Sequence, residues 1–278
     1  MKKSLFVSSL VLTSLIAAVA LAAIPSGLII LQKMADNTGS GVYVIEDEVQ
    51  FPNGQDTLVL KETWFVENDG SMKLLVTGGR ELKDQVQMSF VYSGGQRFHN
   101  GSSQKLTQDF IEKYFHIRKG ETLANDLVRM KIVPASILYK HPVRSTKDVE
   151  HVNENFIRLS RVGGVVTYAF GAPSAPDTSD LSPGFWIEQD QFVLRKFRLP
   201  DQVEVSADKY TSYSRNLWYP RTRTVHWGAN QVTIQTLSVF GRTKDAFAKF
   251  SPKVTQRLDG LNGQPAQALV QEFYQRFR

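Results

Sequence analysis

Residues 57–77 read TLVLKETWFVENDGSMKLLVT, and this stretch decides the fold class. Apolar and polar side chains alternate through residues 57–66 and again through residues 71–77. A period of two places the apolar side chains on one face of a β-strand. The Asn68-Asp69-Gly70 segment between the two halves is a turn signal. The stretch therefore predicts two antiparallel strands that are joined by a tight turn and share one apolar face.

The same pattern recurs on both sides of this hairpin, separated by turns such as Asn53-Gly54 and Gly94-Gly95. Further strands are predicted at residues 42–51, 85–92, 156–162, 165–170, 185–189, 192–199, 203–213, 217–227 and 231–240. The pattern indicates an antiparallel meander of about 10–11 strands, so the fold class is mainly β, or α+β. A sheet of this size curls into a barrel, a half-barrel or two packed sheets.

Three helical regions accompany the strands. A short helix is predicted over residues 28–37, a helical insertion near residues 105–140, and a last helix after Pro265. In the insertion, apolar residues recur at helical spacing from Leu106 onward. An amphipathic helix needs a partner for its apolar stripe, and the concave face of a curled sheet offers one. We therefore expect helices to cover that face.

The N-terminus predicts export from the cytoplasm. Met1-Lys2-Lys3 precedes an uncharged stretch that runs to Leu31 and contains the alanine-rich residues 17–23. A positive start, an apolar core and an Ala-x-Ala pattern are typical of a cleavable secretory signal peptide. We expect a signal peptide at residues 1–23, a single domain at residues 24–278, and a periplasmic protein of a Gram-negative bacterium. The alternative is an uncleaved membrane anchor, since the uncharged run is long enough to span a bilayer.

Composition and motifs argue against several function classes. The net charge is +6, and residues 191–278 hold 14 Lys and Arg and 6 Asp and Glu, a local charge of +8. Export excludes cytoplasmic nucleic-acid binding, and the basic portion is either an ordinary solvated surface or a face that suits anionic lipid headgroups. The sequence has no Cys, so it forms no disulfide and carries no lipid-modified cysteine. The histidines lack metal-ligand spacing, and no nucleophile motif is present. We expect no enzyme activity, no metal and no cofactor.

Several segments resemble the LolA/LolB-type periplasmic lipoprotein carriers, a family of outer-membrane lipoprotein-sorting proteins. They are residues 31–37 followed by the strand meander, residues 184–197, and the run from Tyr219 to Gln235. The resemblance covers most of the chain by pattern and order. It implies an unclosed β half-barrel whose apolar hollow is capped by helices and holds acyl chains. The family's carrier has an Arg-Pro turn where this sequence has Glu67-Asn68-Asp69-Gly70, so the chain resembles a distant relative of that carrier and not its orthologue.

The large apolar side chains of the strands and of the helical insertion are the candidate ligand-binding residues, because soft and bulky side chains repack around differing acyl chains. The candidates are Leu60, Trp64, Met72, Leu74, Met88, Phe90, Tyr92, Phe110, Leu127, Trp186, Phe197, Val232 and Ile234. They predict a carrier or binder of lipid or lipid-modified protein, with transient membrane contact, unless the same side chains simply fill the core. The alternative function is an envelope scaffold that binds another protein through its basic C-terminal portion, including Arg221 and Arg223.

Overall fold

A computed structural model describes residues 24–79, 82, 84–139, 155–174, 181–250 and 256–278 of the protein. The predicted signal peptide lies outside these residues, as does part of the segment after residue 139. The described elements follow the chain in this order: α2 (Gly27–Asp36), β1 (Val42–Asn53), β2 (Asp56–Asn68), β3 (Ser71–Gly78), β4 (Gln87–Ser93), β5 (Gln96–His99), β6 (Ser102–Lys105), the 3-10 helix η1 (Ile111–Phe115), α3 (Gly120–Arg129), η2 (Ala135–Leu138), β7 (Ile157–Val162), β8 (Val165–Phe170), β9 (Gly184–Glu188), β10 (Leu194–Arg198), β11 (Glu204–Tyr213), η3 (Ser214–Asn216), β12 (Leu217–Trp227), β13 (Asn230–Arg242), α4 (Lys244–Lys249), η4 (Asp259–Leu261) and α5 (Gln267–Arg276).

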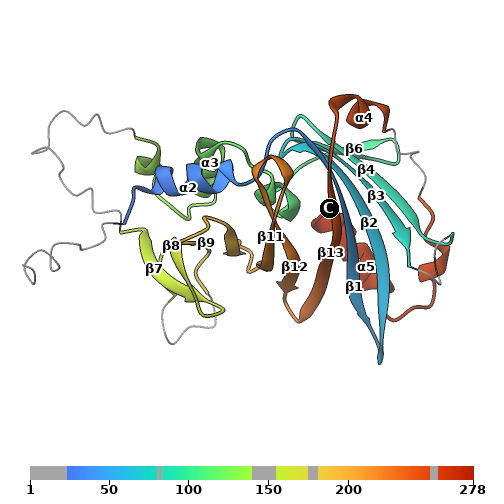
Figure 1. The fold of residues 1–278 in the computed structure, drawn as a ribbon. Helices are drawn as coiled ribbons and strands as arrows, with labels where there is room; N and C mark the ends of the chain where they lie inside the picture. Colours follow the sequence, from blue (N-terminus) through green and yellow to red (C-terminus); the bar gives the residue numbers. More distant parts are fainter. Residues whose placement is uncertain (1–23, 80–81, 83, 140–154, 175–180, 251–255) are drawn as a thin grey trace, which may run out of the picture.

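The strands form one antiparallel sheet in the order β6-β5-β4-β3-β2-β1-β13-β12-β11-β10-β9-β8-β7 (Figure 1). The first and last strands of the chain, β1 and β13, pair at its centre. The order runs from β6 at one edge to β7 at the other without closing, so the predicted unclosed half-barrel is confirmed. Among the described residues, no helix combines the length and apolar composition needed to cross a bilayer.

The opening hairpin forms as its pattern predicts. Strand β2 pairs with β3 from Leu60 opposite Gly78 to Asn68 opposite Ser71. In β3 every second side chain is buried, which places Met72, Leu74 and Val76 on the concave face. The sheet curls because strands twist, and an irregularity in β1 adds to the local bending. This irregularity lies between Glu46 and Asp47, opposite β13.

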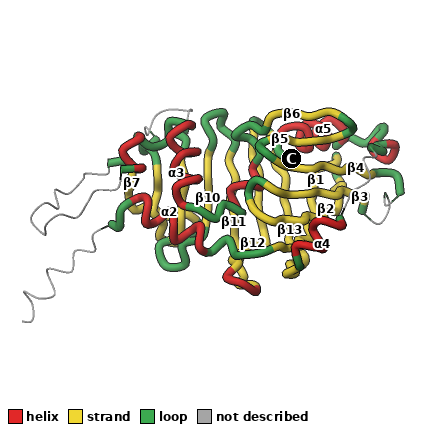
Figure 2. The backbone as a smooth tube through the Cα atoms, turned by 90° about the horizontal axis from the view of Figure 1, so that it is seen from above, coloured by secondary structure: helices red, strands yellow, loops and turns green. Residues whose placement is uncertain are grey.

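Two groups of helices cover different halves of the concave face (Figure 2). Helices α2 and α3 contact one another over the half formed by β7–β10. The Lys33 ammonium of α2 lies 4.5 Å from the centre of the Phe192 ring, just before β10. Helix α5 covers the other half and contacts β1, β4 and β12 through aromatic side chains. The short helix η1 lies between the two groups, with Phe110, the residue before it, stacked on Tyr92.

The structure also contains elements that the sequence patterns do not predict. Strands β5 and β6 are four residues each and mostly exposed, and helix α4 is a six-residue helix with no buried residue. The helical spacing from Leu106 to Phe115 gives only the five-residue η1, whereas the later part of the predicted insertion contains α3 and η2. The apolar residues of η1 are nevertheless buried, because a 3-10 turn and the extended segment before it also direct them toward the sheet.

Candidate functional site: the concave face beneath helix α5

The side chains that the sequence assigns to an apolar cavity are all buried, and Trp186 is the most exposed of them at 8%. Most of them pack into one continuous cluster with the helices. Trp64, Tyr92 and Phe110 stack in series, with ring centres 5.6 and 4.5 Å apart. On the other half, Phe197 packs against Tyr114 and Leu127 lies on the buried side of α3. In this structure protein side chains therefore fill most of the concave face.

Trp186 is the exception among these candidates, because it lies on the opposite face of the sheet. Its neighbour Phe185 stacks on Phe197 at 5.2 Å on the concave face. Adjacent residues of a strand point to opposite faces, so the Trp186 ring lies outside. There it packs beneath the side chains of Lys196 and Arg198, whose charged groups are 5.3 and 5.6 Å from the ring centre. Phe185 takes the concave position that the sequence analysis gave to Trp186.

Helix α5 lies on the concave face through an aromatic stripe. Phe273 meets Phe51 of β1 edge-on at 5.4 Å, and Tyr274 lies parallel to Phe90 of β4 at 6.3 Å. Phe277 meets Trp227 of β12 at 4.8 Å. The α5-facing surface, defined here as Phe51, Phe90 and Trp227 with their apolar neighbours on the same strands, therefore spans the middle of the sheet and most of one half.

Polar contacts also fix α5, chiefly at its C-terminal end. Arg97 of β5 donates hydrogen bonds to the carbonyl oxygens of Tyr274 and Gln275, at 3.0 and 2.8 Å. A cation at this end of a helix is favourable, because the last carbonyls carry partial negative charge. Arg276 forms an ion pair with Asp109 at 2.6 Å, and Trp227 donates to Glu272 at 2.7 Å. Apolar and polar contacts together determine where α5 lies.

A pocket of about 300 Å³ remains between α5, β4 and β5. This volume is at the lower end of the range for small-molecule sites. Two of the candidate residues, Met88 and Phe90, line it from the sheet, and the rest of its lining includes both apolar and polar side chains. The other lining residues are Arg97, His99, Gln256, Leu258, Leu261, Val270, Gln271, Tyr274 and Gln275.

A cluster of charged side chains is buried beside α5 and η1. The buried ion cluster, as we call it, consists of Asp47 (β1), Glu62 (β2), Glu112 (η1), His116, Arg223 (β12) and Arg278. Arg223 donates to Glu112 and Asp47, both at 2.6 Å, and Arg278 donates to Glu62 at 2.9 and 3.1 Å. His116 lies 3.0 Å from Glu112, which also accepts a hydrogen bond from Tyr219 at 2.6 Å. Because Glu112 belongs to η1 and Arg278 follows α5, the cluster joins both helices to the sheet.

Burial and charge act differently on the two carboxyl groups that share Arg223. Burial raises the pKa of Asp47 to about 6, since the attraction of Arg223 offsets only part of the lost hydration. Burial also acts to raise the pKa of Glu112, but Arg223, His116 and Arg278 outweigh it and hold that pKa well below its ordinary value. Glu112 is therefore the firmly ionised centre of the cluster, and Asp47 is its weaker acid.

Sequence reasoning missed the buried ion cluster, although a signal was present. Glu62 lies in phase with the apolar residues Leu60 and Trp64, and both of its sequence neighbours point to the other face. Arg223 lies in the same way in phase with Val225. A charge in the apolar phase of a strand indicates a buried ion pair, because an unpaired buried charge is costly. Arg223 is therefore not part of a basic partner-binding surface, whereas Arg221 is exposed.

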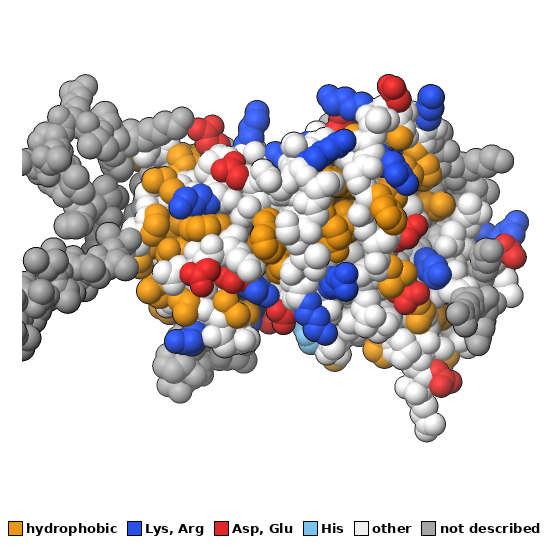
Figure 3. All heavy atoms as spheres, in the orientation of Figure 1, with side chains coloured by type: hydrophobic (Ala, Val, Ile, Leu, Met, Phe, Trp, Pro, Cys, Tyr) orange, Lys and Arg blue, Asp and Glu red, His pale blue; other side chains and the backbone are white. Residues whose placement is uncertain are grey.

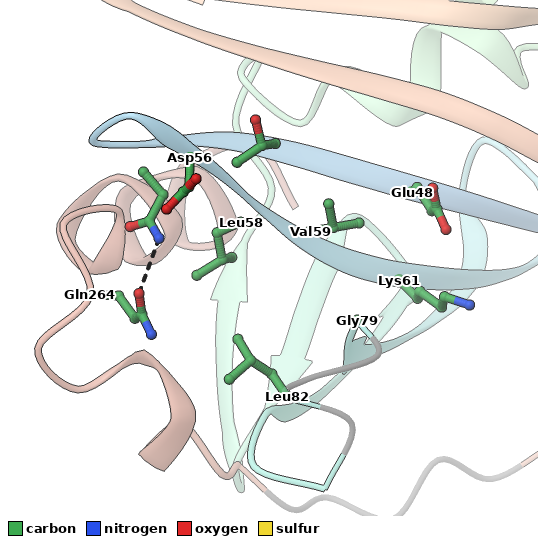
Figure 4. A pocket seen from close by; sticks show the side chains of 10 residues that line it. Glu48, Asp56, Leu58, Val59, Lys61, Gly79, Leu82 and Gln264 are labelled. Atoms are coloured by element: carbon green, nitrogen blue, oxygen red, sulfur yellow. Dashed lines mark hydrogen bonds between the residues drawn. The ribbon is translucent and has the colours of Figure 1, made fainter.

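A larger hollow, about 790 Å³, lies beside the β1–β2 hairpin (Figure 4). Glu48, Asp56 and Lys61 are among its lining residues, and Gln264 accepts a hydrogen bond from Asn53 at 3.0 Å. No residue predicted for the apolar cavity lines this hollow. It is therefore distinct from the concave face beneath α5.

No protein-family model and no curated protein matches the chain. Solved structures similar to it include an outer-membrane lipoprotein-sorting protein domain from Vibrio parahaemolyticus, at 13% identity over 80% of this chain and 96% of that one, with a TM-score of 0.45. A LolA superfamily protein from Nitrosomonas europaea matches at 9% identity over 82% and 99% of the two chains, with a TM-score of 0.46. The MucA/MucB complex of Pseudomonas aeruginosa matches at 12% identity over 80% and 60%, with a TM-score of 0.27. The first two carry the name of the family that the sequence resembles, and the similarity to both is distant.

Proposed function

We propose that the protein is a periplasmic binder or carrier of acyl chains, from lipid or from lipid-modified protein, and that the acyl chain binds on the α5-facing surface. The observation that carries this proposal is the pocket beside α5. Met88, Phe90, Leu258, Leu261 and Val270 give it apolar walls, and residues of α5 line one side of it. Burying each methylene group of a bound chain contributes about 0.8 kcal/mol, so a single acyl chain gives useful affinity.

In this proposal helix α5 is the movable part of the site. The pocket alone is small, and α5 covers the apolar surface that a longer chain needs. Water can replace the partly exposed polar contacts of α5, such as Arg276 with Asp109, when the helix moves, whereas the buried pair of Arg278 with Glu62 keeps the end of the chain on the sheet. Binding then exchanges the aromatic side chains of α5 for the acyl chain. This is a binding role and not an enzymatic one, since the carboxylates of the buried ion cluster are paired and closed to solvent.

Titration with a fluorescent acyl probe tests the proposal. We expect Leu258→Asp to weaken probe binding by about tenfold or more, because it places a charge in the apolar wall of the pocket. Leu237→Asp on β13 is the matched control, since Leu237 is half exposed and lies outside the pocket. Circular dichroism checks that both variants fold. Equal affinities of both variants and the wild type would exclude the pocket as the site.

A second candidate function, the binding of an envelope protein, is favoured by the outer face of β13. Leu237 and Phe240 are 50% and 47% exposed there, and the Arg242 guanidinium lies 5.6 Å from the centre of the Phe240 ring. Figure 3 shows apolar and basic side chains mixed over this part of the visible face. Pull-down from envelope extracts with the wild type and with Arg221→Glu/Arg242→Glu tests it, and a partner lost only by the charge-reversed variant supports this function.

A further inference from the structure

Four large apolar side chains are exposed at one end of the molecule. Ile24 is 41% exposed, Ile29 51%, Tyr139 66% and Leu159 52%. Single exposed apolar residues are ordinary, but gathered ones mark an interaction surface. Ile24 lies three residues before α2, Ile29 lies in the first turn of α2, Tyr139 follows η2, and Leu159 lies in β7. We call these four residues the β7-end patch.

Close packing brings these segments together. A Cβ atom on Gly27 would lie 2.8 Å from the Ile157 side chain and 3.1 Å from that of Ile137. The first turn of α2 thus rests directly on η2 and on β7. The patch residues Ile29, Tyr139 and Leu159 each follow one of these contact residues by two positions. Figures 1 and 2 show the three elements at the same end, and Figure 3 shows apolar side chains there.

Two further features of this end fit a lipid bilayer. The uncharged residues 4–23 immediately precede Ile24 in the sequence. If residues 4–23 are retained as an anchor, which is the alternative to a cleaved signal peptide, they hold this end of the molecule at the membrane. Strand β7 also carries Arg158 and Arg161 and no acidic residue, and Arg161 is exposed on the same face as Leu159. Basic side chains beside apolar ones suit a surface with anionic headgroups.

We propose that the β7-end patch is a docking surface for an anionic lipid bilayer. This role goes beyond the proposed acyl binding and does not depend on it. The patch lies at the edge strand β7, whereas α5 covers the half of the sheet that contains β1 and β4. Side chains at the patch insert among lipid headgroups while the α5-facing surface stays away from the contact.

Site-specific labelling tests the docking surface, because the chain has no native Cys. A polarity-sensitive fluorophore is attached to Tyr139→Cys or Leu159→Cys and, as matched controls, to Leu237→Cys or Phe240→Cys, which are similarly exposed on β13. The variants are mixed with vesicles of phosphatidylethanolamine and phosphatidylglycerol, and with phosphatidylcholine vesicles. We expect a blue shift of emission at positions 139 and 159 that is larger on the anionic vesicles, and no shift at the control positions.

Three results would overturn the proposal. The first is that vesicles cause no emission shift at positions 139 and 159, and the second is an equal shift at all four positions. The third is an emission at the patch that already indicates an apolar environment before vesicles are added. The last result would mean that another part of the chain or a second copy covers the patch. The emission then depends on protein concentration only if a second copy covers it. Vesicle flotation of Tyr139→Ser/Leu159→Ser gives an independent readout, with a several-fold loss expected against Leu237→Ser. Acyl-probe binding stays unchanged in these variants, so failure here is distinguishable from failure of the proposed function.

Discussion

At the scale of single residues, Arg223 is the side chain on which the buried ion cluster depends. It is 1% exposed and is shared between Asp47 and Glu112. Removal of one partner from a buried ion pair leaves an uncompensated charge. We expect Arg223→Leu to lower the free energy of unfolding by about 3–5 kcal/mol, measured by urea denaturation. Arg221→Leu is the control, because Arg221 is exposed two residues away on the same strand and its loss should change stability by less than about 0.5 kcal/mol. Equal losses of unfolding free energy in the two variants would contradict the stabilising role of the buried ion cluster.

The raised pKa of Asp47 makes a second prediction at this scale. A carboxyl group whose pKa is higher in the folded than in the unfolded protein stabilises the fold when protonated, and this contribution is lost as the pH rises toward about 6. Glu112 has the opposite shift, and its contribution is lost only as the pH falls below its ordinary pKa. We compare the free energy of unfolding of Asp47→Asn with that of the wild type, measured by urea denaturation at each pH. As the pH rises from about 5 to about 7, we expect the difference to change by about 1 kcal/mol in favour of the variant. A difference that is independent of pH would contradict this assignment.

At the scale of elements, the long strands follow from the sequence and the polar contacts between distant segments do not. The hairpin of β2 and β3 is encoded by the alternation in residues 57–77, and the turn at Gly94-Gly95 forms with positive φ angles of 59° and 75°. Strands β5 and β6 escape prediction because they are only four residues long and do not alternate apolar with polar side chains.

Of the candidate site, the apolar side chains are predictable as buried, but their environment is not. Alternation does not tell which face of β9 is concave, so Trp186 was placed on the wrong face. The ion pair of Arg278 with Glu62 joins residues 216 positions apart, and no local pattern specifies such a partner. Whether the concave face is hollow depends on where α5 rests, which is likewise a matter of tertiary packing.

The proposed acyl binding requires α5 to move, because the helix covers the apolar surface that a longer chain needs. Asn53 at the end of β1 contacts Gln264 and Ala266 just before α5, at 3.0 Å each. We expect a short thiol crosslinker between Asn53→Cys and Gln264→Cys to hold α5 on the sheet and to reduce binding of the acyl probe by about tenfold or more. Reversal of the crosslink restores binding, and the two single-cysteine variants are the controls. Unchanged affinity in the crosslinked protein would show that the acyl chain binds without movement of α5.

At the scale of the whole molecule, one open sheet presents different surfaces for different tasks. The concave face holds the core, the pocket and the buried ion cluster, and the β7-end patch lies at one edge of the sheet. A sheet that is not closed can admit a helix on one half while other helices pack permanently on the other half. Under the proposed function, a largely filled half-barrel takes up an acyl chain because only α5 has to move.

The most direct test of the central claim is mass spectrometry of the lipid carried by the protein when it is purified from the periplasm without detergent. We predict lipid or a lipid-modified peptide bound at close to one acyl-bearing molecule per protein, and much less in Leu258→Asp than in Leu237→Asp. Protein that carries no lipid, and that takes up none when incubated with vesicles, would contradict the proposed binding of acyl chains.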